Sequence, residues 1–288
     1  MAFSVIVTSY QSPSREPGKT LDECLESIAL QVGPEDEIVV ADCSPVAPEI
    51  RVPRVKLIHF SEKRPVPEMR WAALRATSGD LVAAVESRCV PDSAWLKDLA
   101  EAHAKYPDAA GIGGTVSAFR SSALDDGLYF CEYGHYAPPI AAGPSRELSG
   151  ANLSYKRAAL EKESDLLDAG CWETLIHLRW RDRGIPLALS RADVRFVNGM
   201  PLAVIVRQRF DYGRNYAASR SVPRLPFAAA SAALPFLLTW RLARSAGGKG
   251  LAGRFLRCLP YVFLFNLAWS AGEFCGYLFG PAKGARIY

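Results

Sequence analysis

The chain has 288 residues, of which 49% are hydrophobic, 22% are charged and 10% are aromatic. This balance excludes a disordered chain, a collagen-like chain and a polytopic membrane protein, and the length suffices for a sizeable buried core. The formal net charge is +4, yet residues 201–288 hold 12 Lys and Arg against two acidic residues, which favours a partner with anionic phosphates, either membrane lipid or nucleic acid.

The first hundred residues alternate between short β-branched runs and segments with helical spacing. Continuous apolar runs predict buried strands, and apolar residues three and four positions apart predict helices. We therefore expect strands at 3–7, 37–42, 55–60 and 80–85 and helices at 20–30, 67–76 and 93–105. This alternation is typical of a parallel sheet with helices on both faces, in which ligands bind at the carboxyl ends of the strands.

The pattern becomes looser after Pro107. Helical spacing returns in two places, and the second helix is expected to end at Gly184, which suits the position after a helix C-cap. We expect the remaining elements to be strands at 109–117, 187–190 and 194–197 and helices at 156–162 and 173–183.

Two uncharged apolar runs follow, at residues 226–240 and 259–272. Both are shorter than the roughly 18–20 residues that a spanning helix needs, although residues 274–282 could lengthen the second run. Basic residues lie before, between and after the runs, so the positive-inside rule places all three flanks on the cytoplasmic side. We therefore expect interfacial or re-entrant helices, anchored by aromatic residues near the run ends. A pair of buried core helices in a soluble domain is the alternative.

The seven cysteines are scattered and include no C-x-x-C pair, so they predict neither a zinc site nor a disulfide framework. Met1 leads directly into the first apolar run, without the basic segment and cleavage site of a signal peptide. We therefore expect a body at residues 1–220 and a membrane-associating helical region at residues 221–288, on the cytoplasmic face of the cell membrane.

Six motifs, in order, resemble those of the family 2 glycosyltransferases, which have the GT-A fold. They are Ser-Val-Ile-Val-Thr-Ser-Tyr-Gln at 4–11, Val-Val-Ala-Asp-Cys-Ser at 39–44, Glu-Ser-Arg-Cys-Val-Pro at 86–91 with Trp-Leu at 95–96, Gly-Ala-Asn-Leu-Ser-Tyr-Lys-Arg at 150–157, the helix at 172–184 and the Arg-rich segment at 207–214. The resemblance implies an α/β fold with a Rossmann-like, mostly parallel sheet and helices on both faces, followed here by C-terminal apolar helices.

The resemblance also implies a reaction. A sugar would move from a nucleotide-diphosphate donor to a lipid-linked or membrane-proximal acceptor, with inversion, in polysaccharide or glycolipid assembly. Such an enzyme must hold the base and ribose, neutralise the diphosphate and accept the acceptor's proton. Thr8, Tyr10 and Asp42 match the family's donor-binding positions. Without the resemblance, a loop hydroxyl and a helix cap would be the simpler interpretations of Thr8 and Asp42.

Glu86 and Arg88 mark the main departure from the family pattern. The last acid of the family's Asp-x-Asp motif ligates Mg²⁺ or Mn²⁺ at the diphosphate, and Arg88 cannot bind a cation there. Either Glu86 holds the metal with help from water and other residues, or Arg88 itself neutralises the leaving diphosphate as a bidentate donor. We favour the second alternative. A third is a decayed site in a non-catalytic relative.

Glu173 occupies the position of the family's catalytic base, directly after Trp172. Its alternative role is to complement the positive end of the helix dipole. His177, one turn further, is interpreted as an ordinary helical histidine. Asn152 and Trp172 are matched to the acceptor side, although an N-cap role suits Asn152 equally well. Together with the donor residues, Glu173 is expected to line one cleft at one edge of the sheet.

Arg209 and Arg214, close to Arg207, are matched to donor binding through the diphosphate. The alternative is a basic collar that faces anionic lipid. A nucleotidyltransferase would need a Gly-rich phosphate loop, and residues 8–14 contain no glycine. A non-catalytic membrane scaffold remains the other alternative. Nucleic acid is not expected as a partner, because the positive charge is interleaved with long apolar runs.

Overall fold

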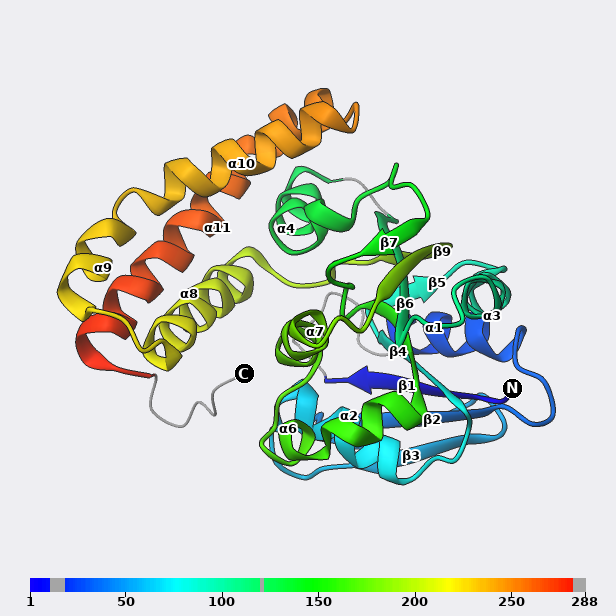
Figure 1. The fold of residues 1–288 in the computed structure, drawn as a ribbon. Coiled ribbons are helices and arrows are strands. Elements are labelled where there is room, and N and C mark those ends of the chain that lie inside the picture. The colour runs from blue at the N-terminus through cyan, green and yellow to red at the C-terminus, as the bar shows by residue number, and fades with distance from the viewer. Residues whose placement is uncertain (11–18, 120–121, 282–288) are drawn as a thin grey trace. The chain divides into compact units, whose positions relative to one another are not determined.

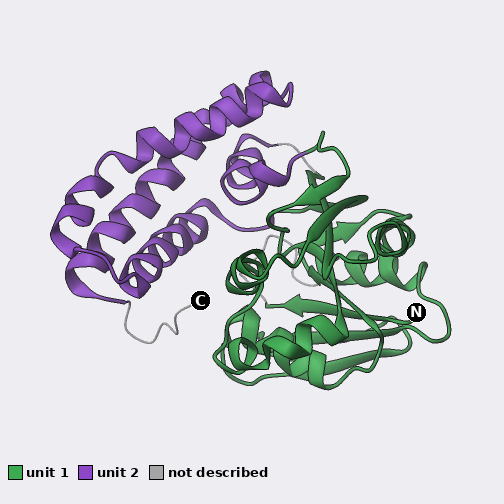
Figure 2. Ribbon diagram, in the orientation of Figure 1, with its two compact units in different colours: residues 1–12, 16–119, 138–197 green, residues 13–15, 120–137, 198–288 purple. Residues whose placement is uncertain are grey.

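The computed structural model describes residues 1–10, 19–119 and 122–281, in two compact units (Figures 1 and 2). In the described chain, unit 1 comprises residues 1–10, 19–119 and 138–197, and unit 2 comprises residues 122–137 and 198–281. The second unit thus begins before residue 220, where the sequence predicts the boundary. The reason is that helix α8 (Leu202–Ser219) packs along helix α11 (Ala252–Phe279).

Unit 1 is built on a nine-stranded sheet with the order β3-β2-β1-β4-β8-β6-β9-β5, and β7 pairs with β9. Strands β3, β2, β1, β4, β6 and β9 run in one direction, and β8, β5 and β7 run in the other. The predicted mostly parallel sheet is therefore confirmed. The strands are β1 (Phe3–Ser9), β2 (Glu37–Asp42), β3 (Val55–His59), β4 (Leu81–Glu86), β5 (Cys89–Pro91), β6 (Gly111–Ala118), β7 (Gly143–Ser145), β8 (Asn152–Lys156) and β9 (Leu187–Phe196).

Helices cover both faces of this sheet. All seven residues of β1 are buried, as expected for a strand covered on two sides. Strand β8 shows which helix lies where, because alternate side chains point to opposite faces. Leu153 and Tyr155 belong to the core that α2, α6 and α7 complete, whereas Asn152 and Ser154 hydrogen-bond to α3 on the other face. The helices are α1 (Lys19–Ala29), α2 (Val66–Arg75), α3 (Trp95–Lys105), α5 (Arg157–Leu160), α6 (Ser164–Asp168) and α7 (Glu173–Asp182).

Three local predictions meet a clear outcome. Gly184 follows α7 with φ of +70°, which confirms the predicted glycine after the helix C-cap. The two strands expected at 187–190 and 194–197 form one strand, β9, because the polar residues between them keep the alternation of buried and exposed positions. The helix expected at 156–162 is α5 followed by a 3₁₀ turn at Glu161–Glu163.

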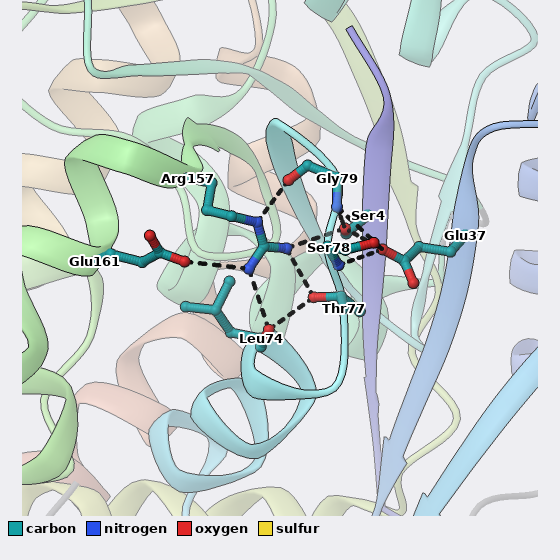
Figure 3. A network of polar contacts seen from close by, with 8 residues as sticks. All are labelled: Ser4, Glu37, Leu74, Thr77, Ser78, Gly79, Arg157 and Glu161. Atoms are coloured by element: carbon teal, nitrogen blue, oxygen red, sulfur yellow. Dashed lines mark hydrogen bonds and ion pairs between the residues drawn. The ribbon is translucent and has the colours of Figure 1, made fainter.

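Arg157, which ends one of the six motifs, lies at the amino edge of the sheet (Figure 3). Its guanidinium donates to the carbonyl oxygen of Gly79 at 2.6 Å and to the hydroxyls of Thr77 and Ser4 at 2.9 and 3.2 Å. The Ser4 hydroxyl in turn donates to Glu37 Oε1 at 2.8 Å. Because Ser4 and Glu37 pair near the starts of β1 and β2, this network fastens the strands at the edge away from their carboxyl ends.

Unit 2 consists of helices. Two of them, α8 and α11, approach closely at glycines: a Cβ atom on Gly213 would lie 2.2 Å from the carbonyl oxygen of Trp269, and one on Gly272 would lie 2.0 Å from that of Phe210. Only glycine permits this approach. The helices are α4 (Ala123–Tyr133), α8, α9 (Arg224–Ser231), α10 (Leu234–Gly248) and α11, with a 3₁₀ turn at Gly134–Tyr136.

The two uncharged runs are helical. The first falls in α9 and α10, which meet at a 61° bend, and the second falls in α11. By length and composition, α11 could cross a membrane, and so could the bent pair if it formed one span. However, 44% of the most apolar stretch of α11 is buried inside the protein. A core helix of a soluble protein has the same properties, so length alone decides nothing.

Candidate active site

The carboxyl edge of the parallel strands brings several predicted residues together. Thr8 pairs with Glu86 in the β1–β4 register, and Ser9 pairs with Asp42 in the β1–β2 register. Strand β8 is antiparallel to β4 and begins opposite Val85, so the loop that precedes it also lies at this edge. Residues far apart in the sequence therefore meet where ligands bind in open α/β sheets.

Glu173 is held at this edge by a buried arginine. Arg70 of α2 has no exposed surface, and its Nη1 donates to Glu173 Oε1 at 2.6 Å. Its Nη2 donates to the carbonyl oxygen of Gly150 at 2.6 Å. A Cβ atom on Gly150 would lie 1.8 Å from Glu173 Oε1. Glycine at 150 therefore leaves the room in which the Glu173 carboxylate meets Arg70.

Electrostatics link Arg70 to a second carboxylate. Burial alone would lower the pKa of Arg70, but the nearby Glu173 and Glu86 carboxylates outweigh burial and raise that pKa above its ordinary value. Thr8 and Glu86 each lie two positions after a core residue, Ile6 and Ala84 respectively. Residues two positions apart in a strand share a face, so Thr8 and Glu86 lie on the face that α2 and α7 cover. Thr8, Glu86, Arg70 and Glu173 thus share one face of the sheet.

The buried side-chain atoms without a hydrogen-bond partner within the described chain include the Thr8 hydroxyl oxygen and the Trp172 indole nitrogen. The Thr8 hydroxyl is buried on β1, and the indole Nε1 of Trp172 is buried at the start of α7. Buried polar atoms are normally paired with protein or with an ordered molecule. The orphaned hydroxyl lies where the family resemblance puts the donor's base. Trp172 is only 3% exposed and packs against Tyr155 and Arg70.

Asp42 lies at the same edge but on the other face, and its carboxylate is already used. Oδ1 accepts from the backbone N–H of Ser44 at 2.9 Å, and Oδ2 accepts from the Ser44 hydroxyl at 2.7 Å. His59 Nδ1 lies 3.0 Å from Oδ1. No helix begins directly after Asp42 in the described chain, so Asp42 is not a helix cap. Asp42 therefore organises the turn after β2, and a base could reach it only by sharing these oxygens.

Arg88, which stands where the family has its metal-ligating Asp, lies beside Glu86. Its Nη2 is 3.6 Å from Glu86 Oε2. Its guanidinium lies over two aromatic rings, 5.8 Å from the centre of Tyr10 and 5.3 Å from that of Phe196. Planar guanidinium groups stack well on such rings. At the end of β4 the site thus presents the Glu86 carboxylate beside the Arg88 guanidinium.

This donor set does not suit a divalent metal. Mg²⁺ and Mn²⁺ prefer oxygen ligands, and Mg²⁺ sites supply one or two carboxylates beside the substrate phosphates. Among the residues that the structure describes, no group of three or more His, Cys, Asp and Glu side chains is placed to hold a metal ion. Glu86, the predicted ligand, instead lies next to the Arg88 guanidinium.

Asn152 has a structural role in place of the predicted contact with the acceptor. It is fully buried at the start of β8, so it caps no helix. Its Oδ1 accepts from Trp95 Nε1 at 2.8 Å, and its Nδ2 donates to the carbonyl oxygens of Thr115 and Ala192 at 2.7 and 3.0 Å. These three bonds tie α3, β6 and β9 together and leave the amide no donor for a sugar.

His177 behaves as the sequence suggests. It is buried in the core, its Nε2 lies 2.7 Å from the Tyr155 hydroxyl, and burial lowers its pKa to about 4. A neutral, buried ring on the inner face of α7 packs the helix onto the sheet. It is not placed as a second base.

Arg209 and Arg214 belong to unit 2. The Arg209 guanidinium lies 4.7 Å from the ring of Trp269, and Arg209 is 8% exposed. Arg214 Nε donates to the carbonyl oxygen of Gly280 at 2.9 Å. Both side chains therefore make contacts within the helical unit. Other predicted positions, namely Gln11 in the first motif and the basic residues Lys283 and Arg286, lie outside the described residues.

Arg70 and Gly150 were not predicted as site residues. A signal for Arg70 was present, because it lies three and four positions before Ala73 and Leu74, within the buried stripe of α2. A charged residue in such a stripe requires a partner. Nothing in the sequence named Glu173, 103 residues later, as that partner.

Known proteins share this architecture. The mannosyltransferase PcManGT from Pyrobaculum calidifontis, in complex with GDP-Man and Mn²⁺, matches with a TM-score of 0.51 and 19% identity, over 94% of this chain and 86% of its own. S. aureus TarS 1-349 matches with a TM-score of 0.48 and 15% identity, over 96% of this chain and 91% of its own. The complex of TarS 1-349 with UDP-GlcNAc matches with a TM-score of 0.48 and 17% identity, over 91% of this chain and 72% of its own. No curated protein sequence matches.

The sheet and its covering helices have the GT-A fold. The family model described as glycosyl transferase family 2 matches residues 4–162, more than half of the chain. The chain belongs to that family. The family that the motifs resemble is thereby confirmed, and so is the enzyme class. The matched residues include the first four of the six motifs.

Proposed function

We propose that this glycosyltransferase moves a sugar from a nucleotide-diphosphate donor to a lipid-linked or membrane-proximal acceptor, with inversion at the anomeric carbon, in polysaccharide or glycolipid assembly. The observation that carries the proposal is the position of the Glu173 carboxylate. Arg70 holds it at the carboxyl edge of the sheet, near Thr8 on β1 and Glu86 on β4. A nucleotide-sugar donor is supported by the mannosyltransferase relative, whose structure contains GDP-Man.

In the proposed mechanism Glu173 acts as the general base. The acceptor hydroxyl attacks the anomeric carbon from the side opposite the diphosphate, and Glu173 accepts the hydroxyl proton as the new bond forms. The bond between the anomeric carbon and the diphosphate oxygen breaks in the same step, so one displacement inverts the centre. The side chain of Glu173 is 25% exposed, which allows an acceptor to reach the oxygen that Arg70 leaves open.

Replacing Glu173 tests this role. Glu173→Gln removes the base but keeps the size of the side chain, so we expect transfer to fall by about 10² to 10⁴-fold. Binding of nucleoside diphosphates, measured by thermal shift, should be retained. Glu49→Gln, at a solvent-exposed carboxylate, is the control and should leave both unchanged. Full transfer activity in Glu173→Gln would exclude the assignment.

Charge neutralisation at the diphosphate is the second part of the proposal. We assign it to Arg88, because the donor set does not suit a metal and the guanidinium is held beside Tyr10 and Phe196. Glu86 orients Arg88 in this scheme. For Arg209 and Arg214 we propose a supporting role in donor binding, and for Tyr10, Asp42 and Trp172 the donor and acceptor contacts that the family resemblance implies.

Chelation separates the two ways of neutralising the diphosphate. Activity should persist in EDTA, because the positive charge belongs to the protein. Arg88→Ala should lose transfer by about 10²-fold or more, whereas Arg88→Lys keeps a charge and should lose less. Strict dependence on Mn²⁺ or Mg²⁺, restored by adding the ion back, would contradict the assignment to Arg88.

The acceptor is proposed to lie at the cytoplasmic face of the membrane. Support comes from unit 2, whose helices combine exposed aromatic and aliphatic side chains with many arginines. Helices of this composition bind at membrane interfaces. A lipid-linked acceptor would be concentrated on the surface that these helices contact.

A further inference from the structure

One side of helix α10 exposes large apolar side chains. Phe236 is 68% exposed, Leu237 is 39% exposed and Trp240 is 57% exposed. Arg241 and Arg244 continue the same side toward the end of the helix and are also exposed. Positions i, i+1, i+4, i+5 and i+8 lie on one face of a helix. This face is therefore apolar at one end and basic at the other.

Helix α11 carries a matching stripe. Its exposed side chains include Leu256 at 65%, Leu267 at 48% and Phe274 at 44%. Phe263 lies seven positions after Leu256 and four before Leu267, so it belongs to the same stripe. Its ring lies 5.4 Å from the ring of Phe236 on α10. The exposed sides of α10 and α11 are thus continuous, and we call this surface the α10–α11 face.

The charges around the α10–α11 face are of one sign. Arg224, Arg241, Arg244 and Arg257 are exposed on α9, α10 and α11. The only acidic residue between positions 212 and 288 is Glu273. It is 6% exposed and accepts a hydrogen bond from Trp269 at 2.6 Å. The face therefore complements a lipid bilayer, in which anionic headgroups lie over an apolar interior.

The rest of α11 is unsuited to a lone spanning helix. Asn266 is buried and donates to the Thr239 hydroxyl of α10 at 3.0 Å. Arg254, near the start of α11, pairs with the buried Asp126 of α4. A helix that crossed the bilayer would have to leave these partners and carry their polar groups into lipid. Within unit 2, α11 is a core helix with one exposed stripe.

We propose that the α10–α11 face docks on an anionic lipid leaflet, with the helices lying in the plane of the membrane and not across it. Phe236, Trp240 and Leu256 enter the boundary between headgroups and acyl chains, while Arg241 and Arg244 contact lipid phosphates. The inference deepens the proposed function by naming the surface that places the enzyme near its acceptor, but the docking itself requires no catalytic activity.

Vesicle co-sedimentation of the full chain tests the proposal. We expect binding to vesicles of phosphatidylcholine with phosphatidylglycerol, and much weaker binding to phosphatidylcholine alone. Phe236→Ser with Trp240→Ser should weaken binding to both kinds of vesicle by about tenfold or more. Arg241→Gln with Arg244→Gln should weaken binding to the anionic vesicles by about fivefold for each arginine. Leu30→Ser, at an 89% exposed apolar residue of unit 1, is the control.

Several outcomes would overturn the proposal. One is unchanged vesicle binding in both double variants. Another is a membrane-bound wild-type protein that resists alkaline carbonate washing, which would mean a spanning helix. A third is a wild-type dimer that Phe236→Ser with Trp240→Ser dissociates, without vesicle binding by either protein, which would assign the face to a second copy. Vesicle binding without sugar transfer would retain the docking face and reject the proposed function.

Discussion

Arg70 explains how a carboxylate can be positioned at a sheet edge without losing its accessibility. The guanidinium is completely buried and makes two short hydrogen bonds, one to Glu173 and one to the backbone at Gly150. A charge buried this deeply is tolerated only when it is paired and hydrogen-bonded. The pair therefore fixes one Glu173 oxygen through Arg70, while the carboxylate as a whole stays partly exposed.

Arg70→Lys is expected to reduce kcat by about 10 to 100-fold, because a lysine cannot span Glu173 and Gly150 with a planar fork. The KM for the donor should change by less than about threefold, since Arg70 acts through Glu173. Steady-state kinetics provides the test. Arg75→Lys, at an exposed position of the same helix, should be neutral. Equal losses in kcat and donor affinity would instead place Arg70 on the donor.

Sequence reasoning could place residues at strand ends but could not judge how their side chains are used. Thr8, Asp42 and Glu86 were all predicted from the ends of neighbouring strands, and the registers put them at one edge. The hydrogen bonds of Asp42 and Asn152 depend on Ser44, His59, Trp95 and two carbonyl oxygens. Except for Ser44, which is two residues from Asp42, these partners are set by tertiary packing, which no local pattern reports.

At the scale of elements, the contact between α8 and α11 depends on glycine. Gly213 and Gly272 face each other's helix so closely that any side chain would meet a backbone carbonyl. Helix axes normally lie 8–10 Å apart, and small residues allow a closer approach. The apolar run of α11 is evident in the sequence but this contact is not, because glycine in a helix carries no periodic apolar signal.

Two glycines of α11 offer a matched comparison. Gly272→Ala should destabilise the protein by about 3 kcal/mol, because its Cβ would lie 2.0 Å from the carbonyl oxygen of Phe210. Gly253→Ala has nothing within 4 Å of the new Cβ, so it should stabilise by about 0.5–1 kcal/mol through helix propensity. Urea unfolding followed by circular dichroism would measure both. A harmless Gly272→Ala would show that α8 and α11 can move apart.

Apart from β5, the strands and helices of residues 1–105 were predicted because each has a clean period. Strand β5 has only three residues and pairs with β9, about 100 positions later. Residues 123–133 form α4, a helix that the sequence did not predict. Its buried side includes Asp126 and Gly127, which break the apolar pattern. Asp126 is neutralised by Arg254 and Gly127 admits Tyr261, both from α11. The helix is thus defined by a partner far along the chain.

At the scale of the whole molecule, acid should weaken unit 1 through two histidines. His103 of α3 lies 2.8 Å from the Ser154 hydroxyl, and His177 of α7 lies 2.7 Å from the Tyr155 hydroxyl. The two helices are thus joined to opposite faces of β8. Burial lowers the pKa of each histidine from 6.5 to about 4. Both rings are therefore neutral in the folded protein at pH values where the unfolded chain binds protons.

The contribution of these histidines to the free energy of unfolding is consequently fully present above pH 6.5, and it decreases as the pH falls toward 4. Between pH 7 and pH 5 each histidine should cost about 2 kcal/mol of unfolding free energy. Urea unfolding at the two pH values, monitored by tryptophan fluorescence, measures the loss. His103→Gln with His177→Gln should flatten this dependence. An equally steep dependence in the double variant would trace acid sensitivity to other groups.

The discontinuous course of unit 2 has a consequence for biosynthesis. Asp126 Oδ1 accepts from Arg254 Nε at 2.9 Å across 128 residues of sequence, so α4 leaves the ribosome long before its partner helix exists. Unit 1 can fold as soon as residue 197 has left the ribosome. At that stage the apolar side of α4 and the Asp126 carboxylate are still exposed. A chain terminated at residue 220 would lack α11, so the apolar side of α4 would stay exposed. We expect such a chain to aggregate or to remain bound to chaperones.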